Sequence, residues 1–498
     1  MATKLIEASF REQKRYSLAE FRHAFDGGKI ELERVQQIIR RLKSRQMLKQ
    51  VKSKEEKDLS ELAEEEISED SLMSEGDKYF VFTFVGILWL EGCIIKCYPK
   101  YCCVNDGDVF DKEELVSVFK ALRKYNRKAD KESVQLYNDR VDQQSFNILA
   151  VMLYFLSDYH ENGLYTNDKQ ILETNGAGDI LWERTINDTF AILQNGRPFY
   201  MELKTRRRVL DEGDYFRRLH QCIVGICSRE LKEKGILDLF ELTEVDEFFE
   251  ELSDFGDENY ICYRIENELN QQFNTRKRLL LQTMYAFVRN ESSVQMQDNF
   301  SMFGTNAFHV VWEDICQEIL QNRLDTDKRY LPKVIGDKLG AEANTLKAYI
   351  ERPNWVIDGK DNKCDTFIPD LITIHQDESW FAIFDAKYYH VKLQGNRISG
   401  QPGIESVSKQ FLYELAYKDV VPNGWNAYNA FLFPYLFNQN AEEKPLFKRI
   451  GEVKMDMFCG AMNLLPIQAI FVNAKMAYDI YLQGGNVVAE ITELASNP

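Results

Sequence analysis

The chain has 498 residues, a net charge of −17, and apolar and aromatic contents of 44% and 12%. This length is too great for a single hydrophobic core, so two to four domains are expected. The composition excludes a disordered protein, and no apolar run approaches the roughly 18 residues of a membrane span. Because the first residues lack the apolar segment of a secretory signal, the sequence predicts a cytoplasmic chain without membrane contact.

Charge is unevenly distributed near the N-terminus. Residues 1–51 contain 12 Lys or Arg against 6 Asp or Glu, whereas residues 52–78 contain 11 acids against 4 bases. Phosphate binding depends on Lys and Arg, so an acidic chain can bind nucleic acid only at particular surfaces. The pattern predicts a basic module at 1–51 followed by an acidic linker at 52–78, for which an exposed helix is the alternative.

The basic module is expected to form short helices followed by a strand. Ser17 can cap a first helix, Gly27-Gly28 ends it, and apolar residues from Ile30 to Leu42 recur at helical spacing. The candidate DNA-binding residues near the end of the second helix are Arg40, Arg41, Lys43 and Arg45. Helix, turn, basic helix and strand suit a winged helix that reads a DNA groove. A small helical bundle or a docking arm with solvated charges is the alternative.

Two further regions follow the acidic segment. In residues 79–300, strands are expected at Tyr79–Leu90 and Gly92–Tyr98, a helix is expected at Gln144–Tyr159, and the remainder is expected to be mainly helical. From residue 301 to 498, a helix, strands, a second helix and more strands predict an α/β domain. The fold class is therefore multidomain α+β, with a β-containing N-terminal part, a helical middle region and a C-terminal α/β domain.

The segment Thr366–Tyr389 has two apolar runs around a polar turn and predicts an antiparallel hairpin. If the hairpin is symmetric about Asp377-Glu378, Asp370 faces Asp385, and Lys387 shares a face with Asp385. Directly opposed side chains lie about 4.5–5.5 Å apart, so the two carboxylates would repel each other unless a cation lay between them. Oxygen ligands suit Mg²⁺. The alternative is a solvated hairpin with ordinary surface charges.

Two helices flank this hairpin in the sequence. Asn306–Leu320 has a helical apolar stripe, and Glu313 borders it, where an acid needs a partner such as a metal site. A peripheral glutamate is the alternative. Ser406–Tyr417 places Gln410 and Tyr413 on one helix face. These two side chains would touch the DNA backbone or brace Lys387, or form an ordinary half-buried face.

The ordered set of motifs resembles the PD-(D/E)XK nuclease superfamily. It comprises Glu313, Pro369-Asp370, Asp385-Ala386-Lys387 and Gln410-x-x-Tyr413. More narrowly, VWEDIC, IPDLIT, FDAKYY and KQFLYELAY resemble the nuclease domain of McrC-type restriction proteins, and Phe84–Tyr101 resembles their N-terminal β-domain. The chain as a whole is similar to the LlaJI-type restriction endonuclease family.

This resemblance implies a function and partners. It implies a type II-like, Mg²⁺-dependent endonuclease that hydrolyses phosphodiester bonds of foreign double-stranded DNA in a restriction system. A McrB-like AAA+ GTPase subunit is the implied partner, and DNA methyltransferases are functionally linked. The sequence has no Walker lysine loop, so nucleotide hydrolysis is expected on another chain. A RecB-like DNA repair nuclease, or a non-cleaving adaptor that stimulates the GTPase, are the alternatives.

The resemblance also implies a role for each site residue. Asp370, Asp385 and the carbonyl of Ala386 would hold the metal, with Glu313 completing its shell directly or through water. Lys387 would orient or activate the attacking water. The implied fold of residues 301–498 is a PD-(D/E)XK restriction-endonuclease-like domain.

Overall fold

The computed structural model describes residues 6–52, 78–90, 92–102, 110–128, 147–290, 300–341, 343–358, 360–363, 366–394, 397–437 and 444–496. The chain forms two compact units, the first made of Met1–Glu132 with Met302–Pro498 and the second of Ser133–Ser301. Helices and several sheets occur in both, which confirms the mixed, multidomain α and β class. Within the described ranges, no helix is long and apolar enough to cross a membrane.

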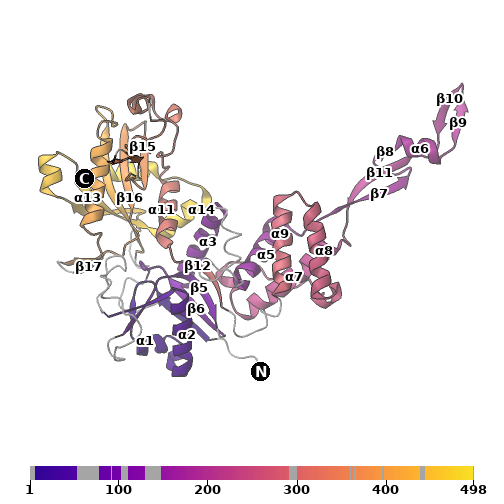
Figure 1. Cartoon of the computed structure of the whole chain (residues 1–498), viewed down its shortest axis with the longest axis horizontal. Coiled ribbons are helices and arrows are strands. Elements are labelled where there is room, and N and C mark those ends of the chain that lie inside the picture. Colours follow the sequence, from indigo (N-terminus) through magenta and orange to yellow (C-terminus); the bar gives the residue numbers. More distant parts are fainter. Residues whose placement is uncertain are drawn as a thin grey trace. The chain divides into compact units, whose positions relative to one another are not determined.

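The first unit begins with two small sheets (Figure 1). Their strand orders are β2-β4-β3 and β1-β6-β5-β12. The elements are β1 (Ile6–Arg11), β2 (Arg15–Tyr16), α1 (Leu18–His23), α2 (Leu32–Ser44), β3 (Leu48–Val51), β4 (Tyr79–Phe82), β5 (Val85–Leu90), β6 (Cys93–Tyr98), α3 (Lys112–Lys128) and β12 (Ser301–Thr305).

The predicted order of helix, turn, basic helix and strand is confirmed by α1, α2 and β3. Ser17 caps α1 through a capping box with Glu20. The core between helices and sheet is aromatic, because the ring of Phe10 lies 4.7 Å from those of both Phe21 and Phe82. Since β3 pairs with β4, a purely helical bundle is the wrong alternative.

The predicted acidic linker at 52–78 is flanked by two strands that pair with each other. Val51 stands opposite Tyr79 and Leu48 opposite Phe82 in an antiparallel pair. The acidic run, of which 53–77 lie outside the described residues, therefore connects two neighbouring strands of one sheet. In addition, β1 runs parallel to β6, so the division between 1–51 and 79–300 is not a domain boundary. Composition indicates exposure to solvent, but it carries no information about which strands pair.

The second unit combines a group of helices with an extended arm, here called the β-arm, which consists of residues 168–210 (Figure 1). Its helices are α5 (Ile148–Asn162), α6 (Trp182–Asp188), α7 (Tyr215–Glu233), α8 (Glu258–Gln271) and α9 (Thr275–Arg289). Its strands are β7 (Asp168–Thr174), β8 (Asp179–Ile180), β9 (Ala191–Gln194), β10 (Arg197–Tyr200) and β11 (Lys204–Leu210).

The expectation of a mainly helical middle region is wrong for residues 168–210. There β7 and β8 pair with β11, and β9 pairs with β10 in the hairpin at the tip of the arm (Figure 1). The Asn195-Gly196 dipeptide joins β9 to β10 with positive φ at both residues. This dipeptide is a strong local signal of a hairpin, and it was available in the sequence.

A five-stranded sheet forms the centre of the C-terminal part of the first unit, in the order β15-β16-β19-β21-β20. The strand β15 is antiparallel to β16, whereas β16, β19 and β21 are mutually parallel. The strands are β13 (Asn354–Ile357), β14 (Lys360–Lys363), β15 (Leu371–His375), β16 (Trp380–Ala386), β17 (Lys392–Gln394), β18 (Arg397–Ser399), β19 (Asn426–Tyr435), β20 (Phe447–Val453) and β21 (Ile467–Asn473). The helices are α11 (Phe308–Ile319), α12 (Lys333–Gly336), α13 (Ile404–Tyr417), α14 (Ala474–Gln483) and α15 (Val488–Ser496).

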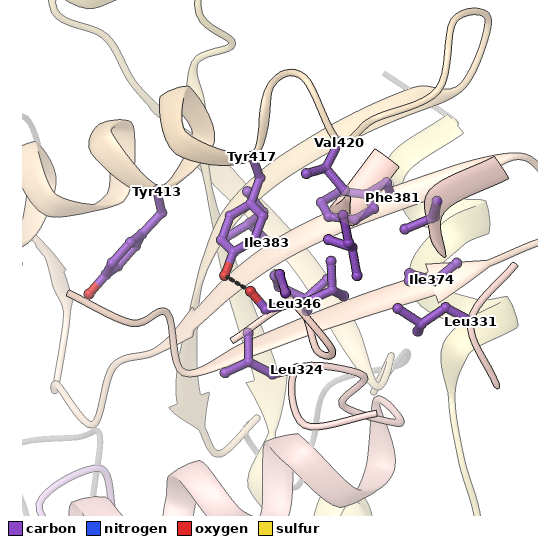
Figure 2. Close-up of a cluster of buried hydrophobic side chains, with 13 residues drawn as sticks. Leu324, Leu331, Leu346, Ile374, Phe381, Ile383, Tyr413, Tyr417 and Val420 are labelled. Carbon is purple, nitrogen blue, oxygen red and sulfur yellow. Dashed lines mark hydrogen bonds between the residues drawn. The ribbon is translucent and has the colours of Figure 1, made fainter. Parts of the chain in front are cut away.

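A buried hydrophobic cluster fixes α13 against the β15–β16 hairpin. Phe381 and Ile383 of β16 pack with Tyr417 of α13 (Figure 2). The Tyr417 hydroxyl donates to the carbonyl of Leu346 at 2.9 Å, so the ring is both packed and hydrogen-bonded. This hydrogen bond holds the C-terminal end of α13 against the segment around Leu346.

Candidate active site

The hairpin has the register that the sequence predicts. Leu371 pairs with Phe384 and His375 pairs with Trp380, and continuing the ladder by one residue places Asp370 opposite Asp385. The backbone N–H of Ala386 donates to Asp370 Oδ2 at 2.8 Å, which holds this carboxyl at the end of β16. The two acids therefore come together at the edge of the central sheet.

Asp385 is the most deeply buried acid of the site, with 4% of its surface exposed. Its Oδ2 atom forms an ion pair with Lys387 Nζ at 3.0 Å. Its Oδ1 atom is buried without a hydrogen-bond partner in the part of the chain that the structure describes. Because buried polar atoms are nearly always paired, this oxygen calls for a donor or a cation, and the side chain of Asp370, which hydrogen-bonds with Asp385, lies at the same place.

The pKa values of the neighbouring acids respond to burial and to one another. Burial, reinforced by the charge of Asp385, raises the pKa of Asp370 far above its usual range, and Lys387 opposes this only partly. Burial and the charge of Asp385 also raise the pKa of Glu313 to about 7. Strongly perturbed acids that share one place with a lysine are typical of functional sites.

Glu313 reaches the site from α11. The predicted apolar stripe of this helix is buried, and Glu313 is half-buried beside it. The helix is fixed to the sheet by Trp312 Nε1, which donates to the Leu432 carbonyl at 3.3 Å. One turn beyond Glu313, Gln317 Nε2 donates to the Asp370 carbonyl at 2.9 Å, a positioning contact that the sequence analysis missed. Its i+4 spacing from Glu313 was the available signal.

The donor set fits a magnesium ion. No group of three or more His, Cys, Asp or Glu side chains suited to a metal occurs among the described residues. Magnesium, however, usually takes one or two carboxylates from a protein and keeps several waters. Asp370 and Asp385 supply that pair, and the unpaired Oδ1 of Asp385 has the chemistry of a ligand. The carbonyl of Ala386 and a role for Glu313 in the metal shell stay predictions.

The predicted DNA contact of Gln410 is wrong, because this side chain has no exposed surface. Its Nε2 atom donates to Asn429 Oδ1 at 2.7 Å and lies 3.4 Å from the carbonyl of Ile383. Gln410 thus connects α13 with β19 and with the strand that carries Asp385. Periodicity places a residue on a helix face, but only packing decides which face covers the sheet.

Tyr413 lies at one end of the buried cluster (Figure 2). Its ring packs 5.5 Å from that of Phe367, and burial together with the charges of Asp385 and Asp370 raises its pKa. A phenol that senses both carboxylates belongs to the immediate surroundings of the site. Its contact with DNA stays a prediction.

The basic residues of the N-terminal module lie at the end of α2 and just beyond it. Arg40 is exposed, and Arg41, Lys43 and Arg45 are half-buried. Lys43 Nζ donates to Gln50 Oε1 of β3 at 3.2 Å, so this lysine contributes to the contact between helix and sheet. DNA binding by these four residues stays a prediction.

The chain belongs to the LlaJI restriction endonuclease family, whose family model matches residues 84–475. This membership makes it a protein of the restriction endonuclease class. A curated relative is the type II restriction enzyme BsuMI component YdjA of Bacillus subtilis (strain 168). The two are 24% identical over 416 residues, which cover 82% of each protein.

Two solved structures are similar over much of the chain. One is a refined half-complex from a tetradecameric assembly of Thermococcus gammatolerans McrB AAA+ hexamers with bound McrC. It shows 14% identity and a TM-score of 0.35, covering 96% of this chain and 99% of that one. The other is the Thermococcus gammatolerans McrBC complex, with 12% identity and a TM-score of 0.23 over 64% and 88% of the two chains. At such TM-scores neither likeness supports a structural argument.

Proposed function

We propose that this chain is a Mg²⁺-dependent DNA endonuclease with a C-terminal PD-(D/E)XK domain, acting as the nuclease subunit of a restriction system. The observation that carries the proposal is the meeting of Asp370, Asp385 and Lys387 at one sheet edge, with a buried carboxylate oxygen left unpaired. Membership of a restriction endonuclease family supports the same reading. The substrate is foreign double-stranded DNA.

Each side chain has a role that follows from its charge and surroundings. Asp370 and Asp385 hold the magnesium ion, which when bound polarises a phosphoryl oxygen and lowers the pKa of a water. Lys387 orients the attacking water and offsets the charge that develops on the phosphate. Glu313, with its raised pKa, accepts a hydrogen bond from water near the two aspartates or donates one to it.

The proposal includes an AAA+ GTPase partner, as the family resemblance implies, and linked DNA methyltransferases that protect the host. The tip of the β-arm supports a protein partner. Phe190, Leu193 and Met201 are 98%, 74% and 74% exposed there. Contiguous exposed apolar side chains are typical of a surface that another molecule covers.

The test is cleavage of a plasmid by the full chain, with Mg²⁺ or with a chelator, and with or without the AAA+ GTPase of the same restriction system. We expect Mg²⁺-dependent cleavage that Asp370→Ala and Lys387→Ala abolish, while DNA binding and folding persist. Lys232→Ala is a matched control, because Lys232 is an exposed lysine of α7 in the second unit, where it forms an ion pair with Glu244. It should cleave as the wild type does.

Retained cleavage in either site variant would contradict the assignment of these residues. Cleavage that requires DNA ends or flaps, and not a particular sequence or methylation, would instead indicate a repair nuclease. Stimulation of the GTPase with no cleavage under any condition would indicate an adaptor.

A further inference from the structure

The residue that follows the candidate catalytic lysine is bonded to the N-terminal part of the chain. The Tyr388 hydroxyl donates to Glu12 Oε2 at 2.6 Å and accepts the backbone N–H of Lys100 at 3.2 Å. Glu12 lies in the turn between β1 and β2, and Lys100 follows β6. The segment that follows β16 is therefore bonded to the turn between β1 and β2, through two residues that are 376 positions apart in the sequence.

Burial makes this hydrogen bond strong. Glu12 and Tyr388 are both buried, and a bond between a hydroxyl and a carboxylate is charge-assisted. The turn itself is fixed, because the backbone N–H of Glu12 donates to the Tyr98 carbonyl at 2.8 Å. A buried carboxylate is costly unless it is hydrogen-bonded, so the phenol is an important part of the surroundings that keep Glu12 inside.

The ring of Tyr388 is held from two further sides. Its centroid lies 5.3 Å from that of Phe308, the first residue of α11, and 6.0 Å from that of Tyr101. Lys100 Nζ lies 4.7 Å from the ring centroid. Because α11 also carries Glu313, the same tyrosine touches the N-terminal part and the helix that brings the third acid to the site.

We propose that the Tyr388–Glu12 hydrogen bond is a positioning device for the nuclease reaction, through which the N-terminal β-region holds Lys387 against Asp385. Residues 387 and 388 share a planar peptide unit, so anchoring the phenol restrains the backbone from which Lys387 projects. Small displacements of such a group are costly for catalysis, about 100-fold for about 1 Å. The inference rests on the proposed nuclease function. Tyr388 and Glu12 are positioning residues and do not touch the substrate.

The test is a double-mutant cycle in the full chain, with the wild type, Tyr388→Phe, Glu12→Leu and the double variant. Cleavage with Mg²⁺ is measured across DNA concentrations, and thermal unfolding is measured beside it. We expect Tyr388→Phe to lower kcat by about 10- to 100-fold with little change in KM. We expect each single variant to be destabilised, and the double variant to be destabilised by less than the sum of the two, because the bond between the phenol and the carboxylate can be lost only once. Its kcat should stay low, since the anchor is absent.

Tyr165→Phe is the matched control. Tyr165 is buried and donates to the carboxylate of Glu268 at 2.8 Å, in the second unit and outside the candidate site. It should lose stability and keep the wild-type kcat.

The opposite results would overturn the inference in distinguishable ways. If kcat in the double variant is higher than in Tyr388→Phe, or if Tyr165→Phe loses as much kcat as Tyr388→Phe, the bond is only structural. Wild-type kcat in Tyr388→Phe overturns the inference alone. A wild-type chain that never cleaves DNA overturns the proposed function, and this inference with it.

Discussion

Two apolar β-hairpins of this chain have opposite environments. Every residue of β16 in the β15–β16 hairpin is buried, and the strand also pairs with β19. Every residue of β9 in the arm hairpin is exposed, and β9 pairs only with β10 within the described residues. Both hairpins combine apolar strand residues with a tight turn that contains positive φ values, at Ser379 in one and at Asn195 and Gly196 in the other.

The difference shows that the local sequence is sufficient to form a hairpin, whereas its neighbours in the tertiary structure decide whether its side chains are buried or exposed. An isolated two-stranded hairpin is marginally stable, so β15–β16 depends on β19, α11 and α13 for its rigidity. The same burial removes water from Asp370 and Asp385 and raises the pKa of Asp370, which gives the site its chemistry. The arm hairpin keeps its apolar side chains available for another molecule.

The largest effect is expected from Asp385→Asn in the buried hairpin. Removing the charge of this buried carboxylate should lower DNA cleavage by more than about 100-fold, because an electrostatic contact with the reacting groups is lost. Thermal unfolding is measured beside cleavage, because the variant also loses the ion pair with Lys387. Asp377→Asn, at the exposed turn of the same hairpin, is the control and should cleave normally. Equal cleavage by both variants would show that depth in the hairpin is irrelevant to the reaction.

A pair of phenylalanine substitutions compares the two hairpins directly. Phe381 is buried in β16 and Phe199 is exposed in β10, so Phe381→Ala should cost about 3–5 kcal/mol and Phe199→Ala less than about 0.5 kcal/mol. Urea unfolding followed by tryptophan fluorescence measures both. Similar losses in the two variants would mean that the arm hairpin is packed as tightly as the β15–β16 hairpin.

A smaller effect is expected in the pH dependence of stability. The pKa of Glu313 is about 7 in the folded chain against 4.5 for an ordinary glutamate, so the folded state binds a proton that the unfolded state has released between these values. The free energy of unfolding should therefore fall as pH rises through this window when metal is chelated. Glu313→Gln should make the decline shallower, and Asp370, raised in the same direction, should account for what remains. Unfolding in urea from about pH 5 to about pH 8 tests this, and an unchanged slope in the variant would contradict it.

The smallest effect on folding is expected from Leu193→Ser at the arm tip. This side chain is exposed, so the free energy of unfolding should change by less than about 0.5 kcal/mol. Binding of a hydrophobic dye should decrease, because part of the exposed apolar surface is removed. Dye fluorescence at equal protein concentration gives the measurement. Unchanged fluorescence would indicate that the tip is already covered, for example by a second copy of the chain.

The local sequence pattern was sufficient to predict several elements of the structure. Period-two alternation and the turn at Gln376–Ser379 fixed the register that sets Asp370 against Asp385, since a slip of one residue would turn each apolar side chain to the other face. The stripe of α11 and the order of α1, α2 and β3 followed from helical spacing in the same way. The prediction of a mainly helical middle region was wrong at 168–210, where the Asn195-Gly196 dipeptide forms the turn of a hairpin.

The sequence by itself determined which acids and which lysine share one hairpin, because pairing within a hairpin is a local matter of turn position and side-chain period. Only the tertiary structure decided that the acidic run connects two paired strands, that the side chain of Gln410 is buried, and that Glu12 accepts a hydrogen bond from Tyr388. These are contacts between segments far apart in the chain. Their existence depends on which surfaces bury one another, and no pattern within a single segment encodes that choice.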